Sequence, residues 1–181
     1  MKEGFTALEN YLCDQLEEQQ MKLGYRNESV HLYVPLSSLN RLLHTQLGAE
    51  EMAEELVRFR AQTENYLGHT GISRRGDRFG LTMKPEASEY VHTVRQQSQF
   101  LRELISLVSD HGVTLDDVGA LFGRYSGRVA SRRFEDGEFD LLLYFEDGIP
   151  DEYRYCFSEE GGHVIYHRFS AGDYEEMYGK A

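Results

Sequence analysis

Hydrophobic and polar positions alternate along residues 128–169, which is the period of an extended chain with one face on a core. The alternation predicts a β-meander of about four antiparallel strands, which is enough for independent stability if a helix covers one face. One predicted strand has a fully apolar face, made of Phe139, Leu141, Leu143 and Phe145. Its opposite face, with Leu142 on it, is only half polar, and we expect that face to be partly solvated.

Turn residues set the expected register of this meander. Asp136-Gly137 is typical of a two-residue hairpin turn, which would place Arg133 opposite Asp140. Gly161-Gly162 permits a second tight turn near the end of the segment, and residues 147–150 supply the connection between the two hairpins. The C-terminal part of the chain is therefore expected to be mostly sheet.

The rest of the chain has helical periodicity, with apolar residues spaced three, four or seven apart. Helices are predicted over residues 3–23, from Ser37 or Ser38 to Leu47, over 49–67, over 86–111 as the longest element, from Thr114 onwards and from Ser170 onwards. Residues 30–34 predict one short strand before Pro35. A hairpin near residues 72–82 is the other extended segment, because Gly76-Asp77 can turn the chain there.

Together these elements predict an α+β protein, in which an N-terminal helical half packs on a C-terminal antiparallel β-meander of about four strands. We expect a mainly helical region at residues 1–112, with the small β-hairpin near 72–82. A short helix and the meander would follow at residues 113–181. A chain of 181 residues fits one domain, so the two regions are expected to form one compact unit.

The net charge of −12 is spread unevenly along the chain. Residues 1–57 hold four basic and ten acidic side chains, residues 58–102 hold eight and four, and residues 103–181 hold seven and seventeen. The acidic ends disfavour loose binding along nucleic acid or along an anionic lipid surface. Only the middle segment has the sign of charge that a phosphate backbone attracts.

Several features indicate a cytoplasmic protein. No run of residues approaches the roughly 18 apolar positions that a membrane helix needs, and the N-terminal sequence lacks the pattern of a secretory signal. Cys13 and Cys156 lie far apart and without zinc-ligand spacing, which favours two reduced thiols. We expect no membrane association.

The hairpin near residues 72–82 carries the sharpest local motif. Two helices, a hairpin with a basic tip and a further helix resemble a winged-helix DNA-binding domain spanning residues 37–92. In that resemblance Arg74, Arg75 and Arg78 would contact phosphates or the minor groove, and helix 49–67 would be the recognition helix. The helix departs from the pattern, because it begins with a Glu-Glu-Met-Ala-Glu-Glu run that would repel phosphates.

No catalytic, cofactor-binding or metal-binding residues are predicted. His163 and His167 share a face of an extended strand, but at roughly 13 Å apart they are too distant to hold one ion. Cys156 could lie across a hairpin from one of these histidines, although a Cys-His pair also needs an exposed, activated thiol. A second basic patch, with Arg132-Arg133 at its end, is expected to pair with Asp136, Asp140 or Asp147 and not with an anion.

Tyrosines gather on the predicted sheet, where they form the candidate protein-contact surface. These residues are Tyr144, Tyr153, Tyr155 and Tyr166. An exposed tyrosine-rich face suits protein recognition. Tyrosines packed under a helix with their hydroxyl groups at the rim would look the same in sequence.

The stretch from FEDGIPDEYRYCFSEEGGHVIYHRF to SAGDYEEMY, with FDLLLYF before it, resembles a bacterial protein family known only as a domain of unknown function. The resemblance implies a cytosolic bacterial origin and carries over no functional residue. Our leading hypothesis is a non-enzymatic protein-interaction or regulatory module, with a protein partner or self-association. The alternatives are a winged-helix DNA-binding regulator and an enzyme whose site is not visible in the sequence.

Overall fold

The computed structural model describes residues 3–180, and the chain divides into two compact units, Met1–Gln97 and Ser98–Ala181. The division falls fifteen residues earlier than the boundary expected between residues 112 and 113. Its position follows from a break in the helix predicted over residues 86–111. Each unit is described by itself below.

The break separates α4 (Pro85–Thr93) from α5 (Gln99–Val108), so the prediction of one long helix is wrong. The hydroxyl of Ser98 caps α5 by accepting a hydrogen bond from the Leu101 amide at 3.2 Å. A serine that bonds the backbone in this way starts a new helix and does not continue an old one. Val94, which directly follows α4, is 66% exposed.

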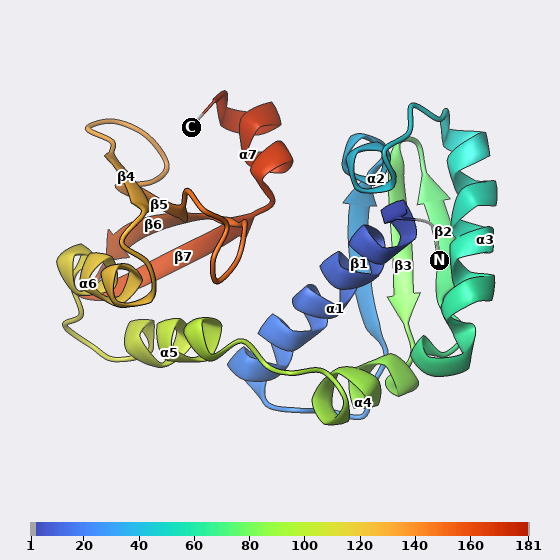
Figure 1. The fold of residues 1–181 in the computed structure, drawn as a ribbon, viewed down its shortest axis with the longest axis horizontal. Coiled ribbons are helices and arrows are strands. Elements are labelled where there is room, and N and C mark those ends of the chain that lie inside the picture. Colours follow the sequence, from blue (N-terminus) through green and yellow to red (C-terminus); the bar gives the residue numbers. More distant parts are fainter. Residues whose placement is uncertain (1–2, 181) are drawn as a thin grey trace. The chain divides into compact units, whose positions relative to one another are not determined.

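The first unit holds helices and a small sheet in alternation (Figure 1). Its elements are α1 (Glu3–Leu23), β1 (Val30–Pro35), α2 (Leu36–Leu43), α3 (Ala49–Leu67), β2 (Gly71–Arg75), β3 (Arg78–Met83) and α4. The three strands form an antiparallel sheet in the order β1-β3-β2. The predicted strand at 30–34 and the predicted hairpin are thus confirmed, and the sheet joins them.

One face of this small sheet is buried against the helices. Val34 and Phe79 on the sheet share a buried core with Leu12 of α1 and Phe59 of α3. The helices themselves approach closely, because Gly4 of α1 lies where a Cβ atom would be 2.7 Å from the Leu43 backbone of α2. The first unit therefore has its own core, and the opposite face of its sheet is left outside that core.

The second unit consists of α5, two further helices and a four-stranded sheet. Its remaining elements are α6 (Leu115–Tyr125), β4 (Val129–Arg133), β5 (Leu141–Phe145), β6 (Arg154–Glu160), β7 (His163–Phe169) and α7 (Ala171–Tyr178). The sheet is an antiparallel meander in the order β4-β5-β6-β7, as the alternation predicted. The protein is an α+β protein, with helices in its N-terminal part and this sheet in its C-terminal part.

The register of the first hairpin differs from the expectation by one residue. Arg133 pairs with Leu141, and residues 134–140 form a loop in place of a two-residue turn. Asp140 is held by β6, because its amide donates to the Phe157 carbonyl at 2.8 Å and its carboxylate accepts from the Glu159 amide at 2.9 Å. This tertiary anchor overrides the local Asp136-Gly137 turn signal.

Both faces of the second sheet are covered, so the expectation of a half-solvated face is wrong. On one face Phe100 of α5 and Phe122 of α6 meet edge to face with ring centroids 4.9 Å apart, and Phe100 contacts Tyr155 of β6. On the other face Leu142 is buried in a second cluster with Phe139, Cys156 and Tyr174. Tyr174 belongs to α7, which supplies the cover that the strand pattern did not reveal.

Candidate functional site

The hairpin of β2 and β3 places its three arginines on two different sides. Arg74 is opposite Phe79 in the register, on the helix-facing side of the sheet. Its guanidinium lies 2.6 Å from the Glu50 carboxylate of α3. Arg75 and Arg78 are opposite each other on the outer side, and both are exposed. The three arginines predicted to contact phosphates therefore do not lie on one surface.

The first turns of α3 are acidic in space as well as in sequence. Glu50 is exposed, Glu51 accepts a hydrogen bond from the Gly48 amide at 3.0 Å, and Glu54 lies 3.7 Å from Arg58. These carboxylates are favourable at the positive end of the helix dipole. Figure 1 shows α3 running alongside β2, where Arg74 pairs with Glu50 of the helix and does not add to a basic surface.

The outer face of the small sheet carries an exposed aromatic ring that the sequence analysis did not single out. Tyr33 of β1 is 74% exposed. It is opposite Gly80 in the register, and a Cβ atom at Gly80 would lie 3.4 Å from the Tyr33 ring. Ser73 continues this row on β2. The sequence did contain a signal for this outward position of Tyr33. His31, Tyr33 and Pro35 alternate with the apolar residues Val30, Leu32 and Val34.

We call this surface the hairpin face, defined by Tyr33, Pro35, Ser73, Arg75, Arg78 and Gly80. Two small residues, Gly80 and Ser73, lie beside Tyr33 in its central row. The turn that ends it is anchored, since the Leu36 amide donates to the Asp77 carbonyl at 2.7 Å. Gly76 in that turn has φ +61°, a conformation that favours glycine. The hairpin face thus presents one tyrosine and two arginines on a fixed backbone.

Burial removes two of the four sheet tyrosines, Tyr155 and Tyr166, from the predicted contact surface. Tyr155 is 0% exposed, its hydroxyl donates to the Asp151 carboxylate at 2.7 Å, and burial raises its pKa well above the usual value. Tyr166 is buried at 8% exposure. Tyr144 and Tyr153 are half-buried under guanidinium groups, those of Arg154 at 3.9 Å and Arg168 at 4.3 Å from the ring centres. Tyr155 and Tyr166 therefore belong to the core, whereas Tyr144 and Tyr153 are partly exposed.

Cys156 and His167 do lie opposite each other across β6 and β7. The thiol is completely buried, and burial raises the pKa of Cys156 to about 12. A neutral, inaccessible thiol is a poor nucleophile. This register pair therefore has no geometry for covalent chemistry.

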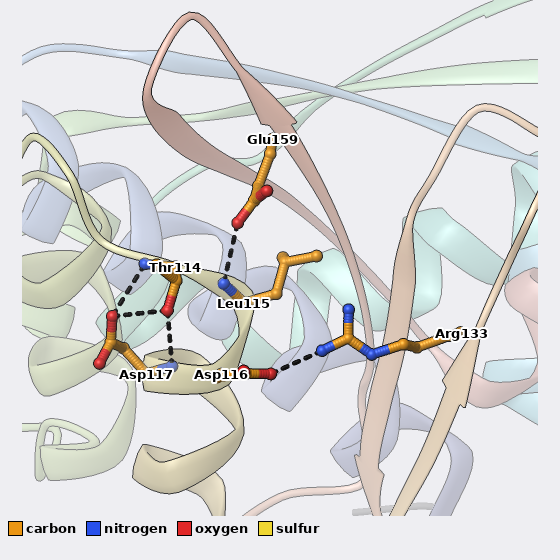
Figure 2. A network of polar contacts seen from close by, with 6 residues as sticks. All are labelled: Thr114, Leu115, Asp116, Asp117, Arg133 and Glu159. Atoms are coloured by element: carbon orange, nitrogen blue, oxygen red, sulfur yellow. Dashed lines mark hydrogen bonds and ion pairs between the residues drawn. The ribbon is translucent and has the colours of Figure 1, made fainter.

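The start of α6 is occupied by the chain's own carboxylates (Figure 2). Thr114 and Asp117 form a capping box, and the Thr114 hydroxyl and amide hydrogen bonds lower the pKa of Asp117. The Glu159 carboxylate accepts from the Leu115 amide at 3.1 Å, and Asp116 pairs with Arg133 at 2.6 Å. Arg133 was expected to pair with a carboxylate across the hairpin. It does pair with a carboxylate, but that carboxylate belongs to Asp116 of α6.

Potential metal ligands are dispersed over residues 3–180. Within that part of the chain, no three histidine, cysteine, aspartate or glutamate side chains gather closely enough to hold a metal ion together. None of the helices described there has the length and apolar content needed to cross a membrane. Two histidine nitrogen atoms do approach each other, Nδ1 of His111 and Nε2 of His163, which are 3.3 Å apart.

Comparison with known proteins identifies the family of the chain. A family model described as a domain of unknown function, from a gene of E. rectale, matches residues 5–178. No curated protein and no solved structure matches the chain. The match covers both compact units, so the family extends over the small sheet and the meander together.

Proposed function

The chain belongs to the DUF3877 family of domains of unknown function, and on that premise we propose that it is a non-enzymatic protein-interaction module acting in the bacterial cytosol. The contact surface is the hairpin face, and its partner is an acidic segment of another protein. The observation that carries the proposal is Tyr33, a large aromatic side chain that is 74% exposed on an ordered strand. Tyrosine and arginine are the residue types most enriched where protein partners bind tightly.

Charge favours an acidic partner. Arg75 and Arg78 are exposed at the end of the hairpin face, and neither has an ion-pair partner among those found in residues 3–180. The turn between them contributes one carboxylate, Asp77. Arg74 does not add to this charge, because Glu50 neutralises it. A short acidic segment laid across Tyr33 would reach both arginines.

The same geometry disfavours DNA as the partner. The helix order and the β1-β3-β2 sheet of the first unit resemble a winged-helix domain, in which α3 would enter the groove. A duplex that met Arg75 and Arg78 and also met α3 would bring its phosphates against Glu50 and Glu54. Like charges so placed repel, whereas a short peptide on the hairpin face avoids α3.

Photo-crosslinking in the bacterium tests the proposal. Tyr33 is replaced by benzoylphenylalanine, and Val57, a 45% exposed residue on α3, receives the same group in the matched control. We expect a protein crosslink from position 33 and none from position 57. Mass spectrometry should assign the crosslinked peptide to an acidic segment, and the purified partner should bind the chain in solution.

Charge variants complete the experiment. The double variant Arg75→Ala, Arg78→Ala should weaken the solution affinity about tenfold, which corresponds to ~1.4 kcal/mol. The charge-matched double variant Arg26→Ala, Arg60→Ala should leave it unchanged. A crosslinked product that is digested by nuclease and not by protease would instead support the winged-helix DNA regulator. Absence of any product at position 33, or equal losses in both double variants, would refute the hairpin face as the contact surface.

A further inference from the structure

Two histidines that are 52 residues apart in the sequence face each other on the surface of the second unit. His111 lies in the connection between α5 and α6, and His163 is the first residue of β7. The Nδ1 atom of His111 and the Nε2 atom of His163 are 3.3 Å apart, with the ring centres at 4.8 Å. Both residues are exposed, so an ion from solution has access to both nitrogen atoms.

The backbone holds the two rings in this position. The Gly112 amide donates to the Gly162 carbonyl at 3.0 Å, which joins the α5–α6 connection to the turn between β6 and β7. Gly161 and Gly162 have φ of +59° and +80°, as a tight turn requires. A Cβ atom at Gly162 would lie 2.7 Å from Cε1 of the His111 ring, so the glycine leaves room for the ring in this position. The two backbone segments that carry the histidines are therefore held side by side.

We propose that His111 and His163 form a binding site for a transition-metal ion of the zinc, nickel or copper type. Two imidazole nitrogens that bind one tetrahedral ion at 2.0–2.1 Å are about 3.3–3.4 Å apart. The observed separation of 3.3 Å meets this requirement without movement of the backbone. Imidazole ligands select these ions over magnesium and calcium, which prefer oxygen.

The ion takes the place of the hydrogen that the two rings now share. One nitrogen donates to the other in the pair, and both must be unprotonated acceptors when they coordinate a metal. Since residues 3–180 place no third histidine, cysteine or carboxylate with them, water molecules complete the coordination. The site is thus open, and it joins the α5–α6 connection to the β6–β7 turn.

Isothermal titration of the full chain with Zn²⁺ at neutral pH tests the site. We expect one ion per chain at this site, with affinity reduced more than about tenfold in His111→Ala and in His163→Ala, because each variant leaves one ligand. His167→Ala is the matched control, since His167 is an exposed histidine on the same strand. Titration with Co²⁺ supplies a second readout, because its visible absorption distinguishes tetrahedral from octahedral coordination.

Circular dichroism of each variant separates loss of a ligand from loss of the fold. A correctly folded His111→Ala or His163→Ala variant that binds Zn²⁺ as tightly as the parent would overturn the proposal. No binding by the parent, or an equal loss in the His167→Ala control, would overturn it as well. None of these outcomes depends on whether the hairpin face binds a partner.

Discussion

Replacing Leu142 by alanine tests whether α7 completes a second core on the meander. Leu142 is 1% exposed and Leu143 is 2% exposed, although the two side chains point to opposite faces of β5. Burial of both predicts that each substitution lowers the free energy of unfolding by about 2–5 kcal/mol, the usual cost of leucine to alanine in a core. A half-solvated Leu142, as the strand pattern alone suggests, would cost much less.

The two losses should differ within that range. Leu143 lies on the sheet face that Phe100 and Phe122 cover, in a well-packed aromatic cluster. The cluster around Leu142 contains three other buried residues, and its outer aromatic rings are only partly buried. A small cluster relaxes more readily around a cavity, so we place Leu142→Ala near 2–3 kcal/mol and Leu143→Ala near 3–5 kcal/mol, within the range seen for core truncations.

Tyr174→Ala supplies the link to α7. Because Tyr174 and Leu142 share one cluster, their double-mutant cycle should give a coupling free energy of about 0.5–3 kcal/mol, whereas the cycle with Leu143 should be close to additive. The measurement is native-state hydrogen exchange of the β5 and β6 amides, since two compact units need not unfold in a single transition. A loss below 1 kcal/mol for Leu142→Ala would refute the two-sided sheet.

Two shorter predictions concern the thiols and one glycine. Burial raises the pKa of Cys13 to about 11 and of Cys156 to about 12, so a thiol reagent should modify neither in the native protein and both after denaturation; native labelling would contradict their burial. Each buried thiol therefore has a higher pKa in the folded protein than in the unfolded chain. Its contribution to the free energy of unfolding is fully present below the unfolded-state pKa and is lost as the pH rises through the folded-state pKa. In urea denaturation, the stability of Cys156→Ala should therefore fall less steeply at alkaline pH than that of the parent. Gly162→Ala should destabilise the second unit by about 1–3 kcal/mol through its positive φ and the His111 ring, and Gly119→Ala, with open space around it, serves as the control in the same denaturation experiment.

Local signals in the sequence determined most of the secondary structure. The alternation within residues 128–169 predicted the four-stranded meander, and the Gly76-Asp77 turn predicted the hairpin near residues 72–82. The helix predicted from Thr114 onwards is α6, and the Thr114 hydroxyl caps it by accepting a hydrogen bond from the Asp117 amide. Such signals are readable because the interacting groups lie within a few residues of each other, where turn chemistry and capping decide the conformation.

Contacts between distant segments decided the rest. Tertiary packing brings β1 to the hairpin and leaves Tyr33 on an open face, places α7 over Leu142, and buries Tyr155, which the sequence placed on a surface. It also sets His111 beside His163 across 52 residues. A pattern of period two assigns side chains to a face of a strand, but it cannot say which faces another element will cover, because that depends on where the chain returns.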